Sequence, residues 1–88
     1  MDDQRLILAD NTNIEQGRAY LSDGELWLMI PGSGFTVLEA AEVFSDTSKT
    51  QKITYVHDEV SEFEGFTDLR MAMIDRDGTM NIKLVRGD

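Results

Sequence analysis

Apolar residues alternate with other residues in several short stretches of this chain, and a period of two is typical of β-strands with one buried face. The first clear case runs from Ala19 to Ile30 and is interrupted by Asp23-Gly24. Asp-Gly suits a two-residue type I′ turn, because both central residues of that turn need positive φ. The segment is therefore predicted to be a β-hairpin in which Leu21 faces Leu26 on the core side.

The other face of this predicted hairpin carries aromatic and methionine side chains, where a sheet covered on one side would present polar residues to solvent. Tyr20 stands across from Trp27, and Met29 stands across from Arg18. Such residues are common anchors of protein interfaces, so we expect Tyr20, Trp27 and Met29 to form a partner-binding patch. The alternatives are a sheet covered on both sides and a Tyr-Trp pair that only stiffens the hairpin.

A second hairpin is predicted near the end of the chain, where two alternating segments surround Asp77-Gly78. A two-residue turn at this position pairs Met73 with Ile82 and Met71 with Leu84. Both methionines are then expected on the apolar core face, while the opposite face is mixed in character and partly in contact with water.

Between the two hairpins the hydrophobic pattern becomes helical. The run Pro31-Gly32-Ser33-Gly34 ends the preceding strand, and Thr36 followed three residues later by Glu39 matches a capping box. A helix is therefore predicted from Val37 to about Ser45. Its broad apolar sector is expected to pack on the sheet, with its acidic residues pointing away.

Two further strands are expected, from Arg5 to Ala9 and from Lys52 to His57. The predicted order is β-β-β-α-β-β-β, with about six short strands in antiparallel meanders and one helix packed on them, which is the α+β class. A chain of 88 residues is long enough for one hydrophobic core and too short for two. We therefore expect a single domain over residues 1–88.

Charge is the one outlier of the composition, because 17 acidic residues against 8 basic ones give a formal net charge of −9. No Lys or Arg occurs from Ala19 to Ser48 or from Ile53 to Leu69. This sign of charge disfavours direct nucleic-acid binding and favours a protein partner with a basic surface. The alternative is that the acids only keep a small domain soluble. The acids expected to contact a partner are Asp58, Glu59, Glu62, Glu64, Asp68, Glu39 and Glu42.

Residues suited to catalysis or metal binding are scarce. The chain has no Cys and one His, and Gly32-Ser33-Gly34 lacks the flanking residues of a nucleophile elbow or a phosphate-binding loop. Asp75, Asp77 and Gly78 lack the spacing of a calcium-binding loop, and His57 is interpreted as a strand-end residue. We therefore expect no enzymatic activity, no cofactor and no metal.

Neither a membrane span nor an export signal is expected. The longest apolar stretch, from Leu26 to Pro31, is far shorter than the roughly 20 residues that a membrane-spanning helix requires. The acidic start of the chain lacks the basic and then apolar pattern of a signal peptide. The absence of cysteine fits a reducing compartment, so the cytoplasm is the expected location.

A family resemblance is carried by the run from Gly34 to Asp46, followed by Lys49-Thr50 and Ile53, and by Glu64-Gly65-Phe66-Thr67 with the closing Asp-Gly hairpin. Over most of its length the chain resembles small acidic proteins encoded by phages and prophages of Gram-positive bacteria. The matching residues are structural, so the resemblance implies no catalytic residue. It implies a phage origin and a role performed by contact.

Two functions of different classes follow from these features. In the first, which the charge favours and which is the preferred interpretation of the sequence, the chain is an acidic inhibitor of the anti-CRISPR or anti-defence type, whose carboxylates replace phosphates on a basic nucleic-acid-binding surface of a host protein in the host cytoplasm. In the second, it is a small structural or assembly component of a virion, in the tail or capsid, that uses the aromatic patch or a strand edge. A third interpretation is a small enzyme or metal-binding domain. The sequence leaves open whether the patch is a homodimer surface.

Overall fold

A computed structural model describes residues 4–32 and 35–87, and within these residues the chain forms eight strands and two short helices. The strands are β1 (Arg5–Ile7), β2 (Asn13–Glu15), β3 (Arg18–Ser22), β4 (Glu25–Ile30), β5 (Lys52–His57), β6 (Glu59–Glu64), β7 (Asp68–Ile74) and β8 (Met80–Val85), and the helices are α1 (Val37–Phe44) and α2 (Thr47–Thr50). None of the helices in the described residues is long and apolar enough to cross a membrane.

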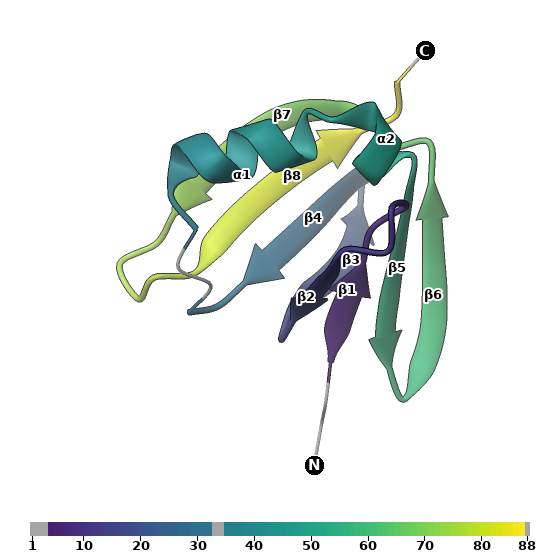
Figure 1. The fold of residues 1–88 in the computed structure, drawn as a ribbon, viewed down its shortest axis with the longest axis horizontal. Coiled ribbons are helices and arrows are strands. Elements are labelled where there is room, and N and C mark those ends of the chain that lie inside the picture. The colour runs from purple at the N-terminus through teal and green to yellow at the C-terminus, as the bar shows by residue number, and fades with distance from the viewer. Residues whose placement is uncertain (1–3, 33–34, 88) are drawn as a thin grey trace.

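The strands form two four-stranded antiparallel sheets. Sheet A has the order β2-β1-β5-β6, and sheet B has the order β3-β4-β8-β7. In Figure 1 helix α1 runs across β7 and β8, and sheet A lies on the same face of sheet B as this helix. The α+β class expected from the sequence is therefore confirmed, but six strands and one helix understate the number of elements.

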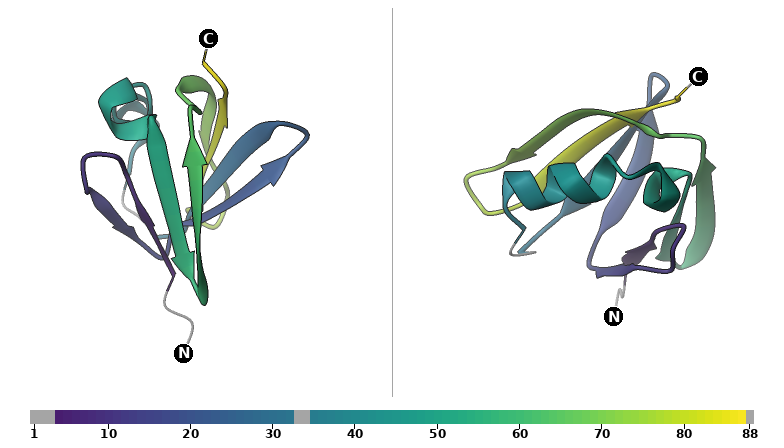
Figure 2. Two further views of the ribbon diagram at one scale, coloured as in Figure 1. Left: turned by 90° about the vertical axis from the view of Figure 1, so that its right-hand side faces the viewer. Right: turned by 45° about the horizontal axis from the view of Figure 1, so that its top comes forward.

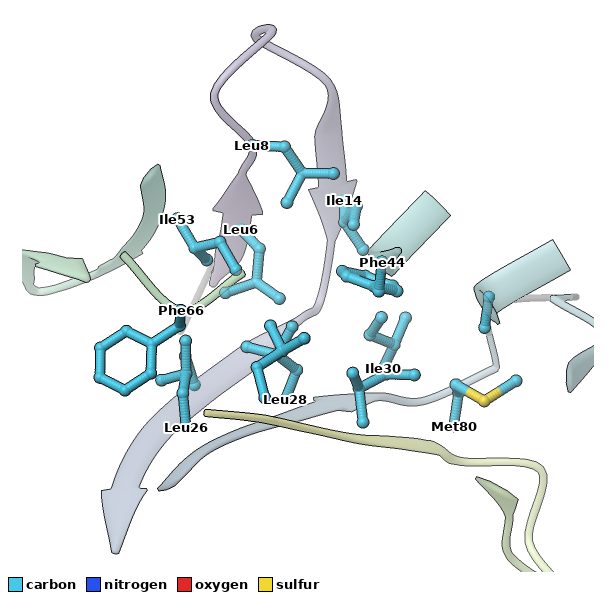
Figure 3. Close-up of a cluster of buried hydrophobic side chains, with 14 residues drawn as sticks. Leu6, Leu8, Ile14, Leu26, Leu28, Ile30, Phe44, Ile53, Phe66 and Met80 are labelled. Carbon is cyan, nitrogen blue, oxygen red and sulfur yellow. The ribbon is translucent and has the colours of Figure 1, made fainter. Parts of the chain in front are cut away.

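The hydrophobic core lies where the inner faces of the two sheets meet α1. Leu6 of β1, Leu28 and Ile30 of β4 and Phe44 of α1 are completely buried, and Figure 3 shows their side chains turned toward one another. Strands β4 and β8 supply alternating buried residues, which is the pattern of strands with one face on a core. The core therefore depends on contacts between residues far apart in the sequence.

The first hairpin has the predicted register. Asp23 and Gly24 have φ values of 52° and 77°, as the type I′ turn requires, and Tyr20 pairs with Trp27. Leu21 pairs with Leu26 as expected, but the side chain of Leu21 is 51% exposed. The expectation that it is a core residue is wrong, because β3 is an edge strand whose only partner among the described residues is β4, which leaves the Leu21 side chain open to solvent.

The second hairpin differs from the prediction in its register. Five residues separate β7 from β8, and Met73 pairs with Asn81 instead of Ile82. Asp77 has no positive φ, and its carboxylate accepts a hydrogen bond of 3.1 Å from the Thr79 N–H. This side-chain bond stabilises a wider turn than the two-residue type, since it fixes the backbone beyond Gly78. Both methionines of β7 therefore lie on the face opposite to the core.

Helix α1 begins and ends where the sequence predicts. The Thr36 hydroxyl accepts from the Glu39 N–H and the Glu39 carboxylate accepts from the Thr36 N–H, both at 3.0 Å, so the capping box is complete. Phe44 is the last helical residue and Ser45 is the C-cap. The loop residues Ser33 and Gly34 lie outside the described residues.

Helix α2 is attached to the loop between β1 and β2 by an ion pair. Lys49 Nζ lies 2.6 Å from Asp10 Oδ2, and the Ala9 N–H donates to the Lys49 carbonyl oxygen at 2.9 Å. The hydrogen bond from Lys49 holds the pKa of Asp10 well below the ordinary value of 3.8, with further help from the Thr12 hydrogen bonds. The same contact raises the pKa of Lys49. It connects segments 39 residues apart in the sequence.

Candidate protein-binding face

The outer face of sheet B, defined as the side away from α1 and sheet A, is built from two rows of directly paired residues. Partners in an antiparallel ladder have their side chains on the same face. The first row runs across the sheet from Tyr20 through Trp27 and Lys83 to Met71. Because four different strands each supply one residue, this row exists only in the folded sheet.

Tyr20, Trp27 and Lys83 form a stacked group at the centre of the first row. The ring planes of Tyr20 and Trp27 are inclined by 9° with centroids 6.4 Å apart, and Lys83 Nζ lies 5.3 Å from the centroid of the Trp27 ring. Lys83 Nζ also lies 3.5 Å from Glu25 Oε2. The indole ring is therefore held between an aromatic neighbour and a cation, which fixes its orientation before any partner binds.

The second row lies two residues further along the strands and consists of Arg18, Met29, Asn81 and Met73. Met73 is 47% exposed, and Met29 is half-buried among its neighbours. Together the two rows place three methionines on the same sheet face as the Tyr20 and Trp27 rings, with Met29 on the same strand as Trp27. Methionine side chains adapt to irregular surfaces, and aromatic rings provide large rigid contact areas, so this composition suits a protein contact.

No described element covers the outer face of sheet B. The left view of Figure 2 shows α1, α2 and sheet A all on one side of sheet B, with nothing on the other. Tyr20 is 47% exposed, and Trp27 and Met71 are half-buried. The structure thus brings the predicted residues Tyr20, Trp27 and Met29 together on one accessible face, and the alternative of a sheet covered on both sides is wrong for the described residues.

Comparisons with protein-family models, with curated proteins and with solved structures found no match to this chain. The function therefore has to be argued from the molecule's own surfaces.

Four of the seven predicted acids lie on the hairpin of β5 and β6. Asp58 occupies its turn with a φ of 52°, and the exposed residues Glu59, Glu62 and Glu64 belong to β6. Glu62 pairs with Lys52 at 3.3 Å. The other three acids form no ion pair within residues 4–32 and 35–87. This hairpin therefore exposes three carboxylates that the described chain does not neutralise.

The remaining predicted acids lie elsewhere. Glu39 belongs to the capping box of α1, and Glu42 is exposed on the same helix. Figure 1 shows α1 and the turn between β5 and β6 near opposite ends of the molecule. Asp68 forms an ion pair of 2.9 Å with Arg70 at the start of β7. The seven acids therefore do not form one continuous surface.

Metal-binding side chains do not cluster in the part of the chain that the structure describes. No group of three or more His, Cys, Asp or Glu is arranged there to hold a metal ion. His57 ends β5 opposite Glu59, and its ring lies 6.1 Å from the ring of Tyr55 between centroids.

The sequence places Lys83 on the mixed face of the second hairpin, but it does not reveal Met71 and Met73 as members of the outer face or the position of Lys83 beside Trp27. The two-residue turn predicts both methionines on the core face, and the pairing of β8 with β4 cannot be derived from local pattern. The alternation of Lys83 with Ile82 and Leu84 is the signal that places its side chain on the solvent side of the sheet.

Proposed function

We propose that this chain is a non-enzymatic protein-binding module that docks on its partner through the outer face of sheet B. The observation that supports this most strongly is the stacked group of Tyr20, Trp27 and Lys83 on a sheet face that no described element covers. An exposed face with aromatic and methionine residues is characteristic of interaction sites.

The partner we propose is a protein whose binding surface has an apolar centre and basic residues around it. The net charge of −9 favours association with a positively charged surface and disfavours other acidic proteins. Glu25 and Asp68 lie at one margin of the outer face, where they can meet cations on a partner. Direct binding of nucleic acid is disfavoured by the same charge.

The role we infer for such a contact is that of a small structural or assembly component of a virion. The family resemblance implies a phage origin, and assembly contacts depend on buried aromatic anchors more than on charge. Trp27 is the natural anchor because it is the largest residue of the face and is already held in place.

A second candidate is the acidic inhibitor of the anti-CRISPR or anti-defence type. The observation that favours it is the exposed carboxylates of Asp58, Glu59 and Glu64, which have no ion-pair partner in the described chain. On this proposal the hairpin of β5 and β6 occupies a basic surface that normally binds phosphates. Its affinity would then fall steeply with salt, because the contact is electrostatic.

The test is a capture experiment from a bacterial lysate that contains phage proteins, read by quantitative mass spectrometry at low and high salt. The bait proteins are the wild type, Trp27→Ala, the double variant Glu59→Gln/Glu64→Gln and the control Val60→Ala. Val60 is 65% exposed on sheet A, so its truncation leaves the outer face of sheet B unchanged.

A sheet-B contact predicts a partner that persists at high salt, is retained by Val60→Ala and is lost with Trp27→Ala. Truncation of a hot-spot Trp costs about 2 kcal/mol or more, which is roughly a thirtyfold loss of affinity. The acidic inhibitor predicts the opposite pattern, with loss in the double variant and at high salt. If every captured protein binds Trp27→Ala as well as it binds the wild type, the sheet-B contact is wrong.

A further inference from the structure

Strand β2 has a free edge. It is the first strand in the order of sheet A, and β1 is its only partner strand in the described residues. Two hydrogen bonds flank β2. The Gln16 N–H donates to the Gln4 carbonyl oxygen at 2.7 Å, and the Leu8 N–H donates to the Thr12 carbonyl oxygen at 2.9 Å. Even-numbered residues of this segment therefore direct their backbone groups toward β1. Bonded pairs recur at every second residue of an antiparallel ladder. The odd-numbered residues of β2 therefore direct their backbone groups away from the sheet.

These odd-numbered residues are Asn13 and Glu15, and their backbone edge borders a cleft of about 420 Å³. Residues 12–16 line one side of the cleft. The other side comes from Ile30 at the end of β4 and from Pro31, Gly32 and Phe35. Ile14 is buried beneath the cleft, so its floor is apolar while one wall offers backbone donors and acceptors.

We propose that this cleft binds an extended peptide of a partner protein, which pairs with β2 as a fifth strand of sheet A. A strand is the one ligand whose alternating N–H and C=O groups match those of Asn13 and Glu15 together. Its side chains would alternate between the apolar floor and the outer face of sheet A. This site uses the edge of sheet A and the end of β4, not the outer face of sheet B, so it does not depend on the proposed function.

Charge specifies the peptide further. The Glu15 side chain is exposed on the outer face of sheet A and forms no ion pair with its cross-strand neighbour Arg5 or any other described residue. A Lys or Arg on the outward side of the bound peptide would meet this carboxylate, and the net charge of −9 favours a basic peptide in general. The chemical class is therefore an extended basic peptide with small β-branched residues toward the floor.

The experiment uses the full chain labelled with ¹⁵N and the peptide Lys-Val-Thr-Val-Thr-Val-Lys with blocked ends, added to millimolar concentration. The amide signals of Asn13 and Glu15 are expected to shift and to become protected from hydrogen exchange. The Ile14 amide, already bonded to β1, is expected to gain little protection. A peptide N-methylated at alternate backbone positions should bind at least about tenfold more weakly, because it cannot complete the ladder.

A matched pair of variants tests the backbone contact from the protein side. Asn13→Pro removes the outward N–H and leaves the bonds to β1, a position at which edge strands tolerate proline. Asn13→Ala keeps that N–H, so it should bind the peptide as the wild type does, while Asn13→Pro loses about tenfold in affinity. If Asn13→Pro does not fold, the N-methylated peptide carries the same comparison.

Three results would overturn this proposal. The Asn13 and Glu15 amides could be protected in the free protein, they could fail to respond to the peptide, or they could shift with protein concentration alone, which would make a second copy the occupant. Trp27 fluorescence is expected to stay unchanged on peptide binding, because Trp27 lies on the outer face of sheet B and does not line the cleft. A failure here is thus distinguishable from a failure of the sheet-B contact.

Discussion

Two methionines of the second hairpin have opposite environments, and their truncation tests the register that places Met73 on the outer face. Met80 is completely buried, whereas Met73 is 47% exposed and pairs with Asn81. A two-residue turn would instead pair Met73 with Ile82 and place it in the core. Met73→Ala and Met80→Ala therefore remove the same side-chain atoms from two positions. In the observed register one position is exposed and the other is buried, whereas the two-residue turn would bury both.

The expected costs follow from burial. Met80→Ala leaves a cavity in the core and should lower the free energy of unfolding by about 2–5 kcal/mol. Full burial of a Met side chain contributes about 1.5–3 kcal/mol, so the half-exposed Met73 should cost about 1 kcal/mol or less when truncated. For a domain of this size the melting temperature falls by roughly 4–8 °C per kcal/mol, which predicts a drop of at least about 8 °C for Met80→Ala.

Urea unfolding followed by Trp27 fluorescence and by circular dichroism measures both variants on one scale. The slope with denaturant must stay the same for the midpoints to report stability. Should Met80→Ala be too unstable to measure, Ile82→Val provides a milder core truncation with an expected loss of about 0.5–1.5 kcal/mol. Equal losses for Met73→Ala and Met80→Ala would refute the register and with it the composition of the outer face.

Three further substitutions test the scaffold. Gly17→Ala should lower stability by about 1–3 kcal/mol in thermal unfolding, because a Cβ there would lie 2.8 Å from the buried Leu6 side chain; an unchanged melting temperature would contradict this packing. Thr36→Ala should lower the free energy of unfolding by about 1 kcal/mol, because the N-cap of α1 is lost, while Thr36→Ser should keep most of the stability that the cap provides. The Asp10–Lys49 ion pair should stabilise the fold above pH 3.8, the ordinary pKa of Asp, and this stability should be lost as the pH falls below that value, because the pKa of Asp10 is lowered in the folded state. The variant Asp10→Asn should flatten this part of the curve of unfolding free energy against pH. An unaltered curve would count against the ion pair.

The first hairpin and helix α1 could be predicted from the sequence, because each is set by residues next to one another in the chain. The Asp23-Gly24 turn sets the register of the first hairpin by its backbone angles, and the Thr36 and Glu39 side chains set the start of α1. The aromatic patch followed from that register, because a period of two fixes which residues share a face. These inferences needed no knowledge of distant contacts.

The elements that the sequence did not reveal depend on distant partners. Strand β6 carries mostly acidic and polar residues and is a strand because Ile53 of β5 pairs with its Phe63. Strand β2 has three residues, and α2 has four, so neither contains a full hydrophobic period. The separation into two sheets follows from β4 pairing with β8 across more than fifty residues, which no local pattern encodes.

The solvent accessibility of Trp27, the single tryptophan of the chain, tests the central claim most directly. Acrylamide quenching of its fluorescence should be measured in the free protein and in the saturated complex with the protein that the wild type captures, using a partner whose own tryptophans are replaced by phenylalanine. We predict that quenching of the half-buried indole falls severalfold in the complex and stays unchanged with a non-binding protein. Equal quenching in the free and bound states would show that the partner docks elsewhere and that the outer face of sheet B is not the contact.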